Sequence, residues 1–154
     1  MTSRRDFLIA AAGTAGGIGL APVSRQARAT PAAMQDAVRK VTGGAALGRG
    51  RVKLDVPPLI DNGNSVPLSV AVDSPMTPSD YVKAIHVLTE RNPLPNVLSV
   101  QLGPRAGRAR IATRVRLADS GTVLAIAELS DGSYWTDSTQ VVVTLSACLE
   151  EVLI

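Results

Sequence analysis

A-R-I-A-T-R-V-R-L, residues 109–117, is the stretch of this sequence that most directly indicates the fold. Arginines alternate with apolar and small side chains at a period of two, which is typical of a β-strand with one buried face and one face in water. One face carries Arg110, Arg114 and Arg116, and the other carries Ile111, Thr113, Val115 and Leu117. The stretch therefore predicts a strand at the surface of a sheet.

Strand patterns of similar length lie on both sides of this stretch. Polar turn formers separate them, as in residues 61–64 (D-N-G-N) and 118–121 (A-D-S-G). Pro67 falls inside one strand pattern and indicates an edge position or a bulge there. The further strands are predicted at 52–56, 65–72, 96–102, 122–129, 133–136 and 141–145.

Two segments carry helix signals instead. Residues 30–42 have a proline near the start and Gly43-Gly44 at the end, and a flexible linker is predicted over 45–50. Thr77, Pro78 and Asp80 have the spacing of a capping box, which predicts a second helix that ends near Arg91.

Together these patterns predict a mainly β protein. About seven strands, with short turns between them, indicate an immunoglobulin-like antiparallel β-sandwich with one or two short helices. We expect four parts: a leader at 1–29, an N-terminal helix and linker at 30–50, the sandwich domain at 51–145 and a C-terminal arm at 146–154.

The first 29 residues have the three parts of an export signal: a charged start, an apolar middle and a small-residue cleavage pattern, Ala27-Arg28-Ala29. The pair Arg4-Arg5 resembles a twin-arginine signal. The apolar run is too short and too rich in glycine to span a bilayer. We therefore expect cleavage near residue 29 and a periplasmic protein with no membrane span after cleavage.

Charge excludes one class of partner. Of 16 basic and 13 acidic residues, four basic and one acidic lie in the leader, which leaves twelve of each in residues 30–154. A neutral chain in which only 3% of residues are aromatic is not expected to bind nucleic acid.

Cys148 is the only cysteine, and it lies six residues from the C-terminus. An unpaired thiol in an exported protein suggests a reactive or intermolecular site, whereas a buried cysteine is simply a small apolar side chain. If the last strand continued past Leu145 with a period of two, Cys148 would fall on its more polar side. This pattern favours a functional thiol.

The other candidate residues are weaker. His86 has no second histidine as a partner, so neither a catalytic base nor a metal site is expected. The glycine-rich residues 103–107 lack a phosphate-binding pattern and predict a turn. Trp135 is expected in the core or at its edge. The arginine stripe described above is either a solvated face or a surface for anions and acidic partners.

Several segments together resemble the SoxY family, the sulfur-carrying subunits of the periplasmic thiosulfate-oxidising system. The resemblance covers essentially the whole chain after the leader. It lies in residues 72–77 (V-D-S-P-M-T), 81–87 (Y-V-K-A-I-H-V), 92–97 (N-P-L-P-N-V), 103–107 (G-P-R-A-G), 113–120 (T-R-V-R-L-A-D-S) and 130–132 (S-D-G), with the leader and the late cysteine.

This resemblance implies an immunoglobulin-like subunit that pairs with SoxZ. It also implies that Cys148 tethers sulfur intermediates: the haem enzyme SoxAX conjugates thiosulfate to the thiol, SoxB releases sulfate, and further enzymes oxidise the remaining sulfane sulfur. The carrier itself would have no catalytic residue and no cofactor.

The arm departs from the family pattern. The family's best-known arm is Gly-Gly-Cys-Gly-Gly, whereas here Ser146-Ala147 and Leu149-Glu150 flank the cysteine. The arm therefore lacks glycine flexibility, six residues spanning up to about 20 Å follow the thiol, and Glu150 and Glu151 disfavour an anionic cargo. Three functions stay open: a thiosulfate carrier, a carrier or redox protein for another thiol-bound group, and a binding module in which Cys148 is not used.

Overall fold

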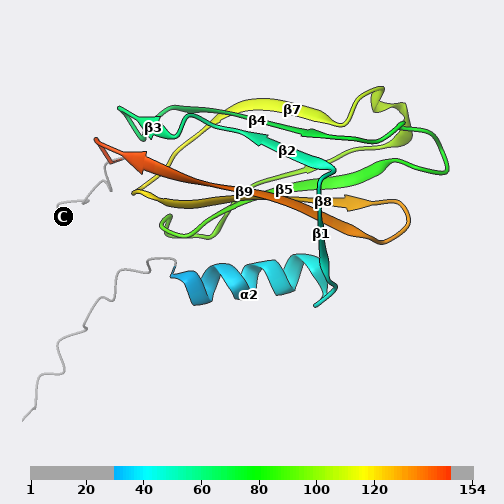
Figure 1. Ribbon diagram of the computed structural model, residues 1–154, viewed down its shortest axis with the longest axis horizontal. Helices are drawn as coiled ribbons and strands as arrows, with labels where there is room; N and C mark the ends of the chain where they lie inside the picture. The colour runs from blue at the N-terminus through cyan, green and yellow to red at the C-terminus, as the bar shows by residue number, and fades with distance from the viewer. Residues whose placement is uncertain (1–29, 147–154) are drawn as a thin grey trace, which may run out of the picture.

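The computed structural model describes residues 30–146, and in them two sheets pack face to face with a helix below the larger one (Figure 1). The predicted leader, and all of the predicted arm except Ser146, lie outside these residues. The elements are α2 (Pro31–Thr42), β1 (Leu47–Arg49), β2 (Val52–Asp55), β3 (Leu59–Ile60), β4 (Val66–Val72), β5 (Val82–Thr89), β6 (Asn96–Gln101), the short 3₁₀ helix η1 (Pro104–Ala106), β7 (Arg110–Val115), β8 (Gly121–Leu129) and β9 (Tyr134–Val143).

The predicted fold class is confirmed. The larger sheet has the order β1-β9-β8-β5-β6, with β3 also paired to β9, and the smaller sheet has the order β2-β4-β7. The long strands pair antiparallel, while the short strands β1 and β3 run parallel to β9. The result is the immunoglobulin-like β-sandwich expected from the strand pattern. No helix among residues 30–146 is long and apolar enough to cross a membrane.

The opening stretch forms β7, at an edge of the smaller sheet. Val115 and Leu117 are buried in the core between the sheets, and Arg110, Arg114 and Arg116 are exposed, as the alternation predicts. Thr113 is exposed despite its position on the inward face, because a pocket opens there at the edge of the sandwich.

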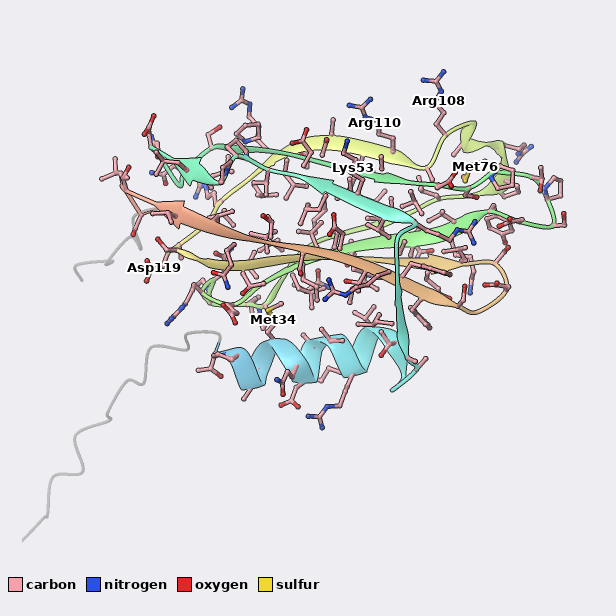
Figure 2. The ribbon with its side chains drawn as sticks, in the orientation of Figure 1. Met34, Lys53, Met76, Arg108, Arg110 and Asp119 are labelled. Atoms are coloured by element: carbon pink, nitrogen blue, oxygen red, sulfur yellow. The ribbon has the colours of Figure 1, made fainter. Side chains whose placement is uncertain are left out.

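Helix α2 confirms the prediction for residues 30–42. The Thr30 hydroxyl accepts a hydrogen bond from the Ala33 N–H at 3.2 Å, and Gly43 ends the helix with a φ of 61°. The apolar side of α2 packs on the outer face of the larger sheet, where Met34 meets the buried side chains of Leu88 and Ile126 (Figure 2).

The second predicted helix is wrong, because residues 82–89 form strand β5 in the middle of the larger sheet. The capping signal is used differently: the Asp80 N–H donates to the Thr77 hydroxyl at 3.1 Å, within a tight turn that leads into the strand. Both faces of β5 are covered, one by the smaller sheet and the other partly by α2. Its sequence is therefore apolar nearly throughout and does not alternate.

Three smaller expectations also change. The linker expected over 45–50 contains strand β1, and the two strands expected at 133–136 and 141–145 form the single strand β9. Pro67 lies in the central strand of the smaller sheet. However, β2 pairs only with residues 69–72 of that strand, so the proline lies where the strand has a neighbour, β7, on one side only.

Candidate functional site

The candidate site is the base of the cysteine-bearing arm, because Cys148 itself lies outside the described residues. Strand β9 ends at Val143. Leu145, which the strand period places on the core side, has an exposed fraction of 56%. The alternation of buried and exposed side chains therefore ends before the arm, so it does not predict which way the Cys148 side chain faces.

The chain is held firmly up to Leu145. The Thr144 N–H donates to the Ile60 carbonyl at 2.9 Å, and its hydroxyl donates to the Asp61 carbonyl at 3.0 Å. The Gly63 N–H donates to the Leu145 carbonyl at 2.8 Å. These bonds continue the pairing between β3 and β9, so the arm starts from a fixed point rather than from a frayed strand end.

Gly63 also connects the arm base to the end of β7. Its carbonyl accepts a hydrogen bond from the Leu117 N–H at 2.8 Å, while its own N–H binds Leu145. Backbones joined in this way lie about 5 Å apart, so Leu145 and Leu117 are separated by at most about 10 Å. The turn at residues 61–64 was predicted from its Asn and Gly residues, but its role as an anchor depends on partners distant in sequence.

A pocket of about 320 Å³ opens between the edge strands β6 and β7, close to this anchor. Arg114, Arg116 and Thr113 line it from β7, and Val97 and Leu98 line it from β6. No aspartate or glutamate lines the pocket. Among residues 30–146, neither arginine belongs to an ion pair.

Asn92 shapes the same pocket from the β5–β6 loop. Its amide donates to the Arg116 carbonyl at 2.7 Å and accepts from the Ala118 N–H at 2.9 Å. Both bonds fix the segment that follows β7. Asn92 itself is buried, so its polar groups are used inside the fold and not for a ligand.

Large apolar side chains are exposed at the arm's end of the sandwich. Leu59 and Val142 are direct neighbours across the β3–β9 pairing, with exposed fractions of 61% and 54%, and Leu145 follows two residues after β9. Neighbouring exposed apolar side chains of this kind are a common feature of contact surfaces.

His86 lies apart from the arm base. It is on strand β5 and not on a helix, and its Nδ1 is 2.8 Å from the Ser99 hydroxyl. Burial lowers the pKa of the imidazole, and the Glu128 carboxylate partly offsets this effect. No group of three or more metal-ligating side chains occurs within residues 30–146.

The two remaining candidates have structural positions. Trp135 is half-buried against the main core, its indole N–H donates to the Ser133 hydroxyl at 3.0 Å, and the Arg51 guanidinium lies 5.6 Å from its ring. This confirms the predicted place at the core edge. The glycine-rich residues 103–107 form the turn that was predicted, with η1 inside it.

Among solved structures, similar folds include a sulfur carrier and superoxide reductases. The sulfur carrier protein SoxY from Chlorobium limicola f thiosulfatophilum aligns with a TM-score of 0.61 and 23% identity, over 74% of this chain and 98% of that one. Superoxide reductase (neelaredoxin) from Ignicoccus hospitalis gives a TM-score of 0.55 and 17% identity, over 61% and 80%. Superoxide reductase from Nanoarchaeum equitans gives 0.52 and 11%, over 62% and 100%. At these identities the likeness establishes the fold alone.

Comparison at the sequence level is more specific. No curated protein matches the chain. The family model of the sulfur oxidation protein SoxY matches residues 38–148, which is well over half of the chain and ends on the single cysteine. The matched region contains the end of α2 (residues 38–42), both sheets and the arm base. The chain therefore belongs to the SoxY family.

Proposed function

We propose that this protein is a sulfur carrier of thiosulfate oxidation, which holds intermediates covalently on Cys148. The observation that carries the proposal is the position of the only cysteine: it is the third residue after Leu145, the last of the described residues with a backbone hydrogen bond to the sandwich, and it lies inside the family match. A thiol this close in sequence to a fixed point of the sandwich could be presented to other proteins on a short arm.

The chemistry needs a thiolate, which is the nucleophilic form of cysteine. Conjugation joins the thiolate sulfur to the outer sulfur of thiosulfate, and the two electrons released pass to the haem enzyme SoxAX. Hydrolysis by SoxB then breaks the bond between the sulfane sulfur and the sulfonate. Water supplies the oxygen, sulfate and two protons leave, and a persulfide stays on Cys148 for further oxidation. In this scheme the carrier contributes the thiol and its placement, and separate enzymes do the chemistry.

We also propose that the chain works as a heterodimer with a SoxZ-like subunit. The exposed apolar residues Leu59, Val142 and Leu145 support a partner at the arm's end of the sandwich, since an isolated monomer gains nothing from exposing them. Contacts with SoxAX, SoxB and the sulfane-oxidising enzymes would be transient. The twin-arginine pattern in residues 1–29 supports export of the folded pair to the periplasm.

The test is a strain in which Cys148→Ser replaces the natural residue. Thiosulfate oxidation is expected to be lost, because serine cannot form the sulfur–sulfur bond. A Ser146→Ala strain is the matched control, since this residue is exposed, lies two positions away and bears no reacting group. Normal oxidation in the Cys148→Ser strain would contradict the proposal and favour a binding module in which the cysteine is not used.

A further inference from the structure

We propose that the outer face of the smaller sheet docks a protein partner whose contacting surface is rich in carboxylates. We call it the basic face, because four exposed cations project from it: Lys53 from β2, Arg110 and Arg114 from β7, and Arg116 directly after β7. The exposed apolar side chains of Leu59 and Val142 belong to other strands, β3 and β9. Docking at the basic face requires neither Cys148 nor the carrier role.

Strand pairing sets the spacing of the four cations. Ala71 in β4 is paired with Lys53 on one side and with Arg110 on the other, so the Cα atoms of these two cations lie about 10 Å apart. Along β7 the basic face extends about 20 Å from Arg110 to Arg116, with Arg114 between them. Figure 2 shows Lys53 and Arg110 on the side of the smaller sheet that faces away from the larger one.

Short side chains form the floor between these cations. Pro67, Ser69 and Ala71 project from β4, and Ala112 projects from β7. Because none of the four is long, a partner can approach the sheet closely between the charged groups. Guanidinium groups at the rim then bind carboxylates through paired N–H donors.

The positive charge of the basic face is not neutralised by neighbouring carboxylates. Residues 91–118 contain six arginines and no aspartate or glutamate, although residues 30–154 are neutral as a whole. The ion pairs found within residues 30–146 involve other cations. The Arg114 guanidinium has a neutral partner, the Ser65 hydroxyl at 3.4 Å. Such a local excess of one charge attracts a partner surface of the opposite charge.

The basic face fits an acidic protein better than a nucleic acid. Nucleic-acid sites combine a continuous positive surface with aromatic side chains. Here Asp55, opposite Ser69 in the pairing of β2 with β4, interrupts the positive charge. The aromatic residues of the described chain, Tyr81, Tyr134 and Trp135, lie outside the smaller sheet. In a protein complex Asp55 can pair with a cation of the partner and fix its orientation, and we expect the complex to weaken with salt.

Purified protein is titrated at low salt with a ten-residue peptide in which glutamate and serine alternate, and backbone amide chemical shifts report where it binds. The shifts should fall on residues 53–55, 67–71 and 110–116, and a peptide with glutamine for glutamate should give none. Arg110→Gln/Arg114→Gln should weaken binding about three- to tenfold. The control Arg39→Gln/Lys40→Gln removes the same charge from exposed positions on α2 and should change binding less than about twofold.

Cross-linking with a water-soluble carbodiimide, which joins an amine directly to a carboxylate, tests the basic face in a cell extract. The chain has three lysines: Lys53 on the basic face, Lys40 on α2, and Lys83, whose ion pair with Glu128 supplies an internal cross-link as a positive control. Mass spectrometry should find Lys53 joined to aspartate or glutamate of another protein, and Lys40 much less often. Arg110→Gln/Arg114→Gln should abolish these cross-links although Lys53 is retained.

Peptide shifts outside the basic face, equal effects of the two double variants, or cross-links no more frequent at Lys53 than at Lys40 would each overturn the inference. A ten-nucleotide thymidine oligomer that binds the basic face more tightly than the acidic peptide at the same salt concentration would overturn it in favour of nucleic-acid binding. Neither readout involves Cys148, so each result is independent of whether thiosulfate oxidation requires that residue.

Discussion

Replacement of Val87 by alanine distinguishes the strand at residues 82–89 from the helix that its sequence suggested. On a helix, Tyr81, Ala84, Ile85 and Leu88 share the buried face, and Val87 lies outside it. In the structure Val87 is on strand β5 with an exposed fraction of 0%, inside the core between the two sheets.

The expected loss follows from this burial. Val→Ala removes two methyl groups, which is worth about 1.6 kcal/mol of transfer free energy. The cavity left in a closely packed core raises the loss in the free energy of unfolding to about 2–3 kcal/mol. Leu94→Ala is the control: Leu94 is 74% exposed, so its loss should stay within about 0.5 kcal/mol.

Urea unfolding followed by fluorescence provides the assay, because Trp135 is the only tryptophan and lies at the edge of the same core. With a typical urea slope of about 1–3 kcal/mol per molar, the midpoint should fall by about 0.7–3 M for Val87→Ala. A fall no larger than that of Leu94→Ala would refute the place of Val87 in the core, and with it the central strand of the larger sheet.

Three further changes have defined outcomes. Gly48→Ala puts a Cβ 2.8 Å from a ring carbon of Trp135, so it should cost about 1–3 kcal/mol and shift the tryptophan emission; unchanged emission would contradict this packing. Asn92→Ala removes two hydrogen bonds that fix the segment after β7, so thermal unfolding should show a loss of about 2–3 kcal/mol, and a neutral variant would contradict their role. The pKa of His86 is lowered in the folded state, so the unfolded chain binds more protons just below its ordinary value of 6.5. The free energy of unfolding should therefore fall as the pH drops below about 6.5, and His86→Asn should reduce that slope; an identical slope in the variant would show that burial does not perturb this group.

Sequence reasoning succeeded where one local signal decided the structure. The alternation in residues 109–117 predicts β7 with its arginines outward, and the cap residues predict α2. It failed for β5, because a strand covered on both faces loses its alternation and a capping signal can also close a turn. It also missed β1 and β3, which are short and pair with the distant strand β9.

The candidate site likewise has one part with a local sequence signal and other parts that depend on distant partners. Cys148 was proposed from the sequence, because a single thiol in a chain that is expected to be exported has few structural explanations. The anchor at Gly63 and the pocket between β6 and β7 could not be predicted. Both depend on segments fifteen or more residues apart that meet at one end of the sandwich, and no local sequence pattern predicts that contact.

Mass spectrometry of the protein from cells that are oxidising thiosulfate tests the carrier role most directly. The peptide that contains Cys148 should carry a thiosulfate-derived group or additional sulfane sulfur, and dithiothreitol should remove it. A different removable group would indicate another cargo. A peptide that carries only the free thiol throughout active oxidation would contradict the account.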